Sequence, residues 1–311
     1  MNQNRLNLAF RFGLIALFGL ITIVSSAQNS TKTLKRIIID PGHGGTDPGS
    51  NGKYSTEAAV SLAISLKLED YIHQSMPDVE VVMTRTTDVF NSVVEKANIA
   101  NQAKGDLFVC IHTNSADPSK SREIVGYKKK TYTVKKKGKS RKVTRDFPIY
   151  KYTYTPSTAK GTETFIYGVS KSDERKEVAD DMVDDLVEKL DSVSERQIKE
   201  LNSSDPTRSM MASLLTQQYF QRAASLALTI EEEFKIAGRI SREAKQRPKG
   251  IWVLQAVAMP AVLVETGFIS NPEDEDYLNS EVGQNEICEV ITKSLLRYKS
   301  SLENQKKTNT K

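Results

Sequence analysis

The chain is poor in cysteine, histidine and tryptophan, and it contains no internal repeat. Its two cysteines, Cys110 and Cys288, lie within apolar patterns and lack the spacing of metal ligands, so two buried thiols are expected rather than a disulfide. Of the three histidines, His73 falls on the rear of a predicted helix and is assigned no role. The histidines left for a functional site are His43 and His112.

Long apolar runs are also absent, except at the N-terminus. Arg5 and Arg11 are followed by an apolar core over 12–24, and small residues then end at Ala27. This pattern predicts a secretory signal peptide over 1–27, and hence a protein exported to the periplasm or cell envelope. Because the apolar run is short for a bilayer, no stable membrane span is expected after cleavage. An uncleaved anchor is the alternative interpretation.

The sequence has no large excess of either charge. Its 44 Lys and Arg oppose 39 Asp and Glu, and the predicted signal peptide holds two of the arginines and no acid. So small a positive charge does not imply nucleic-acid binding, and no nucleic-acid partner is expected. The charged and apolar fractions are those of an ordinary soluble globule, and a monomer is expected.

Apolar strand patterns alternate with amphipathic helical patterns along most of the chain. This alternation predicts a single α/β domain over 34–302, with a mostly parallel, twisted central sheet of about six strands flanked by helices. Residues 239–247 are expected to be a basic linker, and 303–311 a disordered tail. The predicted strands are 34–40, 79–84, 106–112, 162–167, 250–255 and 260–265, and the predicted helices are 55–75, 91–104, 207–237 and 282–302.

Two segments depart from this alternation. Residues 120–151 hold thirteen Lys or Arg and two acids, and a glycine-containing turn separates two alternating runs, which predicts a basic β-hairpin insertion over 117–160. Residues 173–203 predict an inserted acidic helix, with nine Asp or Glu between 173 and 191. The basic segment is either a solvated loop that aids solubility or a flap that attracts anionic polymers of the cell envelope.

Four residues with metal or acid–base chemistry lie where strands end or a helix begins. His43 follows the first strand in Asp-Pro-Gly-His-Gly-Gly, Glu57 opens the first helix, and His112 and Glu265 end two further strands. In such sheets these positions converge at one edge. Two imidazoles and a carboxylate can hold zinc and leave a position for water, while a second glutamate handles protons. Each residue alone also has a plain structural explanation, such as a turn histidine or a glutamate at a helix dipole.

The segments around these residues resemble the zinc-dependent N-acetylmuramoyl-L-alanine amidases called amidase 3, which process cell-wall peptidoglycan. By this resemblance, His43, Glu57 and His112 bind one zinc ion and Glu265 is the catalytic glutamate. The chain departs from the family at Ala58 and Lys96, where the family often has a basic residue and usually arginine, respectively. The matching segments are 39–49, the helix of Glu57, 83–85 with Asp88, 97–101, 106–114, 161–164 and 259–272.

The resemblance also implies an activity and its regulation. The bond cut would join the lactyl group of N-acetylmuramic acid to L-alanine of the stem peptide, in cell-wall remodelling or cell separation. Asp40 and Asn114 are candidates to orient the zinc-bound imidazoles. In cell-division members, an inserted helix blocks the zinc site until a protein activator moves it; here 173–203 would be that helix, with Glu188 one candidate carboxylate. The alternatives are a catalytically silent wall-binding or regulatory protein on the same fold, and a zinc peptidase.

Overall fold

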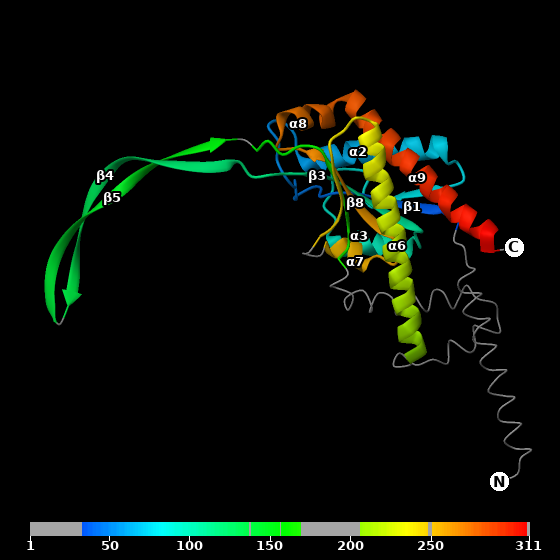
Figure 1. The fold of residues 1–311 in the computed structure, drawn as a ribbon, viewed down its shortest axis with the longest axis horizontal. Helices are drawn as coiled ribbons and strands as arrows, with labels where there is room; N and C mark the ends of the chain where they lie inside the picture. Colours follow the sequence, from blue (N-terminus) through cyan, green and yellow to red (C-terminus); the bar gives the residue numbers. More distant parts are fainter. Residues whose placement is uncertain (1–32, 137, 156, 169–205, 248–250, 310–311) are drawn as a thin grey trace, which may run out of the picture.

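The computed structural model describes residues 33–309, except 137, 156, 169–205 and 248–250 (Figure 1). The predicted signal peptide and the predicted acidic helix over 173–203 lie outside these described residues. Within the described part of the chain, no helix is both long and apolar enough to cross a bilayer.

A six-stranded sheet forms the centre of the domain, in the order β2-β1-β3-β8-β6-β7. Strands β2, β1, β3 and β8 run parallel, whereas β6 is antiparallel to β8 and parallel to β7. The prediction of a mostly parallel sheet of about six strands is therefore confirmed. The strands are β1 (Arg36–Pro41), β2 (Glu80–Met83), β3 (Leu107–Asn114), β6 (Thr162–Ile166), β7 (Ser241–Gln246) and β8 (Ala261–Phe268).

Helices cover both faces of this sheet (Figure 1). On one face, α2 (Glu57–Ser75), α6 (Pro206–Ile236) and α9 (Glu281–Asn309) enclose a core with Ile37 and Ile39 of β1. On the other face, α3 (Val93–Gln102) and α7 (Trp252–Ala256) pack near Ile38. Because β1 and β3 are covered on both sides, their sequences are continuous apolar runs rather than alternating ones.

The fifth predicted strand is wrong. Within the segment predicted as a strand over 250–255, residues 252–255 belong to the short helix α7, and the sheet instead takes β7 from the segment predicted to be a basic linker. A short apolar run such as Trp-Val-Leu-Gln-Ala does not distinguish strand from helix. Strand β7 lies at the edge of the sheet and is mostly exposed, so it has no apolar pattern, and backbone pairing with β6 alone defines it.

The C-terminal region also differs from its prediction. Helix α9 continues to Asn309, so most of the segment 303–311 predicted to be disordered is helical. Glu, Gln and Lys in this stretch favour a helix, which lets the backbone continue beyond the last buried residue, Leu302. A further short helix, α8 (Pro272–Asn279), was not predicted; Asn271 caps its first turn and a proline follows at once.

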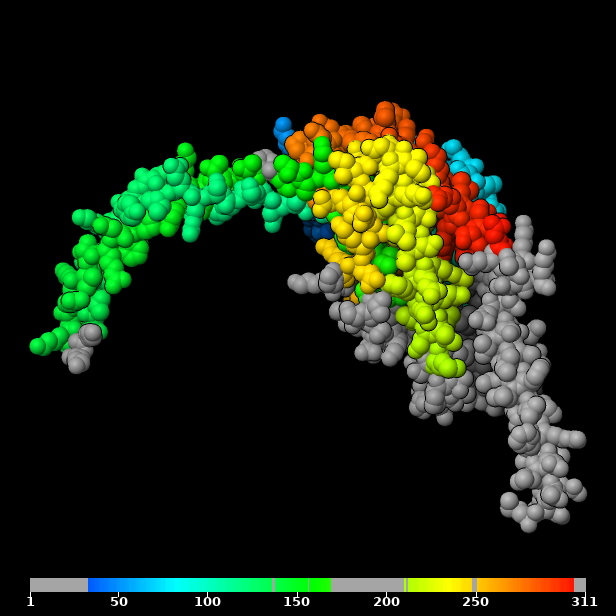
Figure 2. Space-filling model, viewed as in Figure 1, coloured from blue at the N-terminus to red at the C-terminus, as the bar shows by residue number. Residues whose placement is uncertain are grey.

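The predicted basic insertion is an antiparallel hairpin of β4 (Ser119–Lys136) and β5 (Lys139–Thr155). It forms a separate two-stranded sheet that projects from the domain (Figures 1 and 2), and we call it the arm. Its strands pair from Ser119 opposite Thr155 to Lys136 opposite Lys139, with one irregularity near Ile124. Gly138 supplies the positive φ of +75° that the tight turn requires.

Candidate active site

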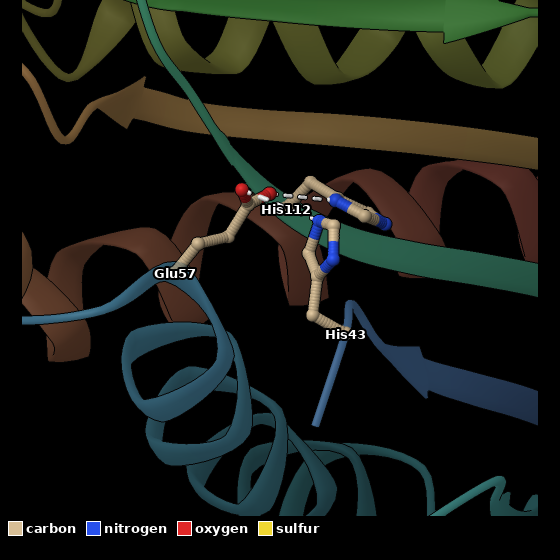
Figure 3. A group of neighbouring side chains, drawn as sticks. All are labelled: His43, Glu57 and His112. Carbon is tan, nitrogen blue, oxygen red and sulfur yellow. Dashed lines mark hydrogen bonds and ion pairs between the residues drawn. The ribbon is translucent and has the colours of Figure 1, made fainter. Parts of the chain in front are cut away.

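The predicted site residues converge at one edge of the sheet, because β1, β3 and β8 are parallel neighbours. His43 lies just beyond the end of β1, while His112 and Glu265 occupy facing positions on β3 and β8. Glu57 is the first residue of α2 and reaches the same place from the helix (Figure 3). The topology therefore brings together residues that are 222 positions apart in the sequence, from 43 to 265.

His43, Glu57 and His112 form a tight group of potential metal ligands. One ligand atom from each residue lies within 4.8 Å of the other two. Glu57 Oε1 is 2.7 Å from Nδ1 of His112, and Glu57 Oε2 is 3.3 Å from Nε2 of His43 (Figure 3). The two imidazole rings meet edge to face, with centroids 5.0 Å apart. The carboxylate thus spans the two rings.

Close backbone approach makes this grouping possible. His43 itself has a φ of +56°, in the left-handed region that non-glycine residues rarely adopt outside functional sites. A Cβ added to Gly49, at a φ of +65°, would lie 2.6 Å from Cδ2 of His43 and 2.8 Å from Oε2 of Glu57. A Cβ on Gly42 would lie 2.6 Å from Cε1 of His112. Glycine is therefore required where the loop passes both histidines.

Asp47 orients His43, although the sequence pointed elsewhere. Its Oδ2 lies 2.8 Å from Nδ1 of His43, which leaves Nε2 facing Glu57. The two residues predicted for this role do not contact either histidine ring in the described hydrogen bonds. Asp40 pairs with Lys96 at 2.9 Å, and Asn114 donates to Glu163 at 3.2 Å. The sequence signal that could have indicated this contact was the four-residue spacing between His43 and Asp47.

A buried arginine joins the two segments that carry His43 and Glu57. The Arg85 side chain is 3% exposed and donates to the carbonyl oxygens of Gly42 at 2.7 Å and Ala58 at 2.9 Å. It also donates to Pro41 at 3.2 Å and to Thr87 at 3.1 Å. One rigid guanidinium therefore fixes the loop before His43 against the first turn of α2.

Helix α8 holds the other side of the Glu57 segment. The Glu275 carboxylate accepts hydrogen bonds from the backbone N–H groups of Lys53, Tyr54 and Ser55, at 2.8, 2.9 and 3.0 Å. These three bonds fix the loop that leads into α2. They also lower the pKa of Glu275, against the opposing effect of its desolvation. Sequence reasoning missed this contact because it missed α8.

Within the group of potential ligands, the imidazole of His43 and the carboxylate of Glu57 each stabilise the charged form of the other. The side-chain hydrogen bond to Glu57 raises the pKa of His43 to about 9, although desolvation opposes it. Burial alone would raise the pKa of Glu57, but its hydrogen bonds to His112 and His43 hold that pKa well below the usual range. Without a metal, the group is thus an ion pair between a carboxylate and a protonated imidazole, and a metal ion must displace that proton.

Glu265 has a different electrostatic environment. It is 6% exposed, and its Oε2 has no hydrogen-bond partner among the described residues. The pKa of Glu265 is raised to about 7, chiefly by burial; His112 and Arg247 lower it, and Glu57 and Glu163 contribute to the rise. A carboxyl group of this kind exchanges its proton near neutral pH, which is the property of a general acid or base.

Glu163 is a neighbour that the sequence analysis did not single out. It faces Glu265 across the β6–β8 pair and is itself buried. Its carboxylate accepts a hydrogen bond from Arg242 and lies 3.1 Å from Nζ of Lys245. Both cations come from β7, the strand that was mistaken for a linker. Because β7 was predicted to be a linker, the sequence analysis could not anticipate these ion pairs beside Glu265.

The donor set fits a zinc ion. Two imidazole nitrogens and one carboxylate are the ligands of many catalytic zinc sites, and such sites keep a further position for water or substrate. Asp47 supplies the hydrogen bond to a ligand histidine that usually accompanies them. Among the described residues, His43, Glu57 and His112 are the one such group of three.

Comparison with known proteins identifies the family of the chain. The family model for N-acetylmuramoyl-L-alanine amidases matches residues 37–297. The chain belongs to this amidase family. N-acetylmuramoyl-L-alanine amidase AmiC of Escherichia coli O6:H1 is 30% identical over 265 residues, which are 84% of this chain and 52% of that relative. The chain therefore spans about half the length of that family member.

Solved amidase structures share the fold. The N-acetylmuramoyl-L-alanine amidase from Clostridium difficile 630 superposes with a TM-score of 0.53 at 23% identity, covering 87% of this chain and 99% of that one. The CwlD amidase from Clostridioides difficile, solved in complex with the GerS lipoprotein, gives a TM-score of 0.51 at 22% identity, covering 86% and 99%. The single α/β domain is thus that of the amidase family.

Proposed function

We propose that this protein is a zinc-dependent N-acetylmuramoyl-L-alanine amidase. It hydrolyses the amide bond between the lactyl group of N-acetylmuramic acid and L-alanine of the stem peptide, in cell-wall remodelling or cell separation. The observation that carries the proposal is the group of His43, Glu57 and His112, with ligand atoms within 4.8 Å, beside the buried and unpartnered carboxyl oxygen of Glu265. Membership of the amidase family supports the choice of substrate.

His43, Glu57 and His112 would hold one zinc ion. When bound, zinc supplies Lewis-acid polarisation of a carbonyl group and lowers the pKa of a water ligand to about 7. Neighbouring residues hold the donors in place for metal binding. Asp47 keeps Nε2 of His43 toward Glu57, and Arg85 fixes the backbone on both sides.

Glu265 would move the protons. In its ionised form it accepts a proton from the attacking water, and in its protonated form it delivers that proton to the nitrogen of L-alanine as the C–N bond breaks. Water is thereby added across the amide, giving a lactyl carboxylate and a free stem peptide. A pKa of about 7 populates both forms of Glu265 at neutral pH.

Export and regulation rest on segments outside the described residues. We propose that the mature protein acts as a monomer in the periplasm or cell envelope, because 1–27 has the pattern of a signal peptide. Cell fractionation of the full-length chain tests this, and retention in the cytoplasm would contradict it. The inhibitory helix over 173–203 and its protein activator stay predictions, since those residues are not described.

Digestion of purified sacculi with two variants tests the chemistry. Glu265→Gln should keep its zinc and lose about 10²–10⁴ of the rate, because it removes the proton carrier alone. His43→Ala should lose both zinc and activity. Zinc is measured by elemental analysis, and products by mass spectrometry.

The products separate the alternatives. Free stem peptides with intact glycan strands are expected. Cuts within the stem would indicate a peptidase, and absence of any release would indicate a wall-binding protein. Full activity of Glu265→Gln would exclude its role as the proton carrier.

A further inference from the structure

The arm has a large net positive charge, whereas the rest of the chain does not. Its segment 120–151 carries thirteen of the 44 Lys and Arg but two of the 39 Asp and Glu, so the remainder of the chain is net acidic. No arm residue whose exposure is described is buried. The arm therefore has no hydrophobic core, and it projects away from the domain (Figure 2).

The arm begins and ends beside the candidate active site. Strand β3, which carries His112, leads into β4 through a short loop, and β5 leads into β6, which carries Glu163. The loop before β4 is fixed to the end of β8 by a hydrogen bond from Ala116 N to Ser270 Oγ, at 3.0 Å. A bond of 2.8 Å from Ile269 N to Asn114 O adds to this attachment. The root of the arm therefore lies next to the strand ends that carry the candidate metal site.

Aromatic rings and cations alternate on one face of the arm near its root. Tyr150, Tyr152 and Tyr154 lie at alternate positions of β5, and the latter two are 46% and 58% exposed. Lys120 Nζ is 4.1 Å from the Tyr152 ring centroid, and the Arg122 guanidinium is 4.8 Å from that of Tyr150. Such a row offers both flat apolar surfaces and positive charges along one line.

The opposite face repeats the pattern toward the tip. Lys130 Nζ is 5.9 Å from the Phe147 ring centroid, and the Arg145 guanidinium is 5.7 Å from that of Tyr132. An element that lies on a membrane gathers its apolar side chains on one face. Because aromatic residues occupy both faces here, the arm fits a flexible anionic polymer better than a flat lipid surface.

We propose that the arm is a second binding element for the peptidoglycan polymer, outside the candidate active site. This rests on the proposed amidase function and names the form of its substrate: wall strands rather than short soluble fragments. Lys and Arg bind the carboxylates of successive stem peptides, and the tyrosine row stacks on sugar rings. An isolated two-stranded ribbon with many like charges is marginal in water, and a bound polyanion offsets that repulsion.

Two arm variants and one control separate binding to the polymer from catalysis. The first variant replaces Lys128, Lys129 and Lys130 with glutamine, and the second is Tyr152→Ser with Tyr154→Ser. The control replaces three exposed lysines of the domain with glutamine, and so removes the same charge from elsewhere; they are Lys35, Lys235 and Lys293. Each full-length mature protein is assayed on intact sacculi and on a soluble monomeric muropeptide.

At low salt, both arm variants should hydrolyse sacculi about tenfold more slowly than the wild type, with muropeptide rates within about twofold. The control should match the wild type on both substrates. Added NaCl should slow the wild type on sacculi toward the lysine variant, because the exposed charges are screened. Arginine at the three arm positions should restore the rate, since the charge is retained.

Binding is measured separately with Glu265→Gln, which should digest the sacculi about 10²–10⁴ times more slowly than the wild type. Co-sedimentation should be weakened by the arm substitutions and not by the control ones. If the wild type releases no stem peptide from either substrate, the proposed function fails, while co-sedimentation still decides the role of the arm. Unchanged sacculus binding in the arm variants would overturn the proposal. Arm-dependent binding to anionic phospholipid vesicles or to DNA, with none to sacculi, would overturn it as well.

Discussion

The site edge of the sheet and the arm hold their charged groups in opposite ways. At the site, Glu57 and Arg85 are buried, and each makes several hydrogen bonds. On the arm, every cation whose exposure is described is exposed, and the described contacts of these cations are mainly with aromatic rings. The comparison teaches that charged residues have two different roles in this protein. At the site they hold neighbouring atoms in fixed positions, whereas on the arm they contribute only to the net charge of the surface.

The difference follows from desolvation. A buried charge must recover its lost hydration from partners at defined positions, so removal of one partner is costly and the geometry is fixed. An exposed charge keeps its hydration and gains little from any single neighbour. Metal binding needs the first arrangement, whereas attraction of a polymer needs only the second.

The largest expected effect compares two arginines. Arg85→Met should lower the free energy of unfolding by about 3–5 kcal/mol, because four backbone carbonyls lose a buried donor. Arg145→Met, on the arm, should cost at most about 1 kcal/mol. Urea denaturation of the zinc-free proteins measures both. Equal losses in the two variants would contradict the comparison.

A second prediction concerns pH. Burial raises the pKa of Glu265 from 4.5 to about 7, so the folded state holds this proton more tightly than the unfolded state. Stability is therefore lost as pH rises from about 4.5 to 7. Glu265→Gln should be more stable than the wild type above pH 7, by up to roughly 3 kcal/mol, and nearly equal to it below pH 4.5.

Zinc-free thermal and urea unfolding across this pH range would check the effect of Glu265→Gln. The exposed arm residue Glu123 provides the control, and Glu123→Gln should change stability by less than about 0.5 kcal/mol throughout. A constant difference between Glu265→Gln and the wild type from pH 4 to 8 would show that burial does not perturb Glu265.

The smallest expected effect compares two glycines. The methyl group of Gly42→Ala would lie 2.6 Å from the His112 ring, so the ring must move, at a cost of about 1–3 kcal/mol. Zinc affinity should fall about 10–100-fold, as for other changes that reorient a ligand. On the arm, Gly126→Ala meets only Ile149, at 3.9 Å, and should leave zinc affinity unchanged. Competition with a chelator measures both affinities.

The sequence predicted those parts of the fold that are defined by local patterns. The continuous apolar runs of β1, β3 and β8 are buried on both faces, so each was recognisable without its neighbours. The edge strand β7 was not, because its polar residues become a strand only through pairing with β6. Helix α8 was missed although Asn271 and Pro272 mark its start.

The candidate site shows the same contrast between what local patterns predict and what depends on distant contacts. His43, Glu57 and His112 were predicted because two follow or end parallel strands, one opens a helix, and the surrounding segments resemble amidase 3; the structure brings the three together. Their neighbours could not be chosen in this way. Asp47, rather than Asp40 or Asn114, contacts His43, because the direction of each side chain depends on loop geometry that no periodic pattern specifies.

The sequence by itself thus predicted the α/β order and the position of a basic hairpin, and its resemblance to the amidase family singled out the four candidate site residues. Only the tertiary structure decided that Asp47 orients His43, that Arg85 joins the two ligand segments, and that Glu163 faces Glu265. The physical reason is the separation along the chain between the residues that interact. Burial patterns and turns are local properties of the chain, whereas hydrogen bonds between buried groups depend on which distant segments the fold places side by side.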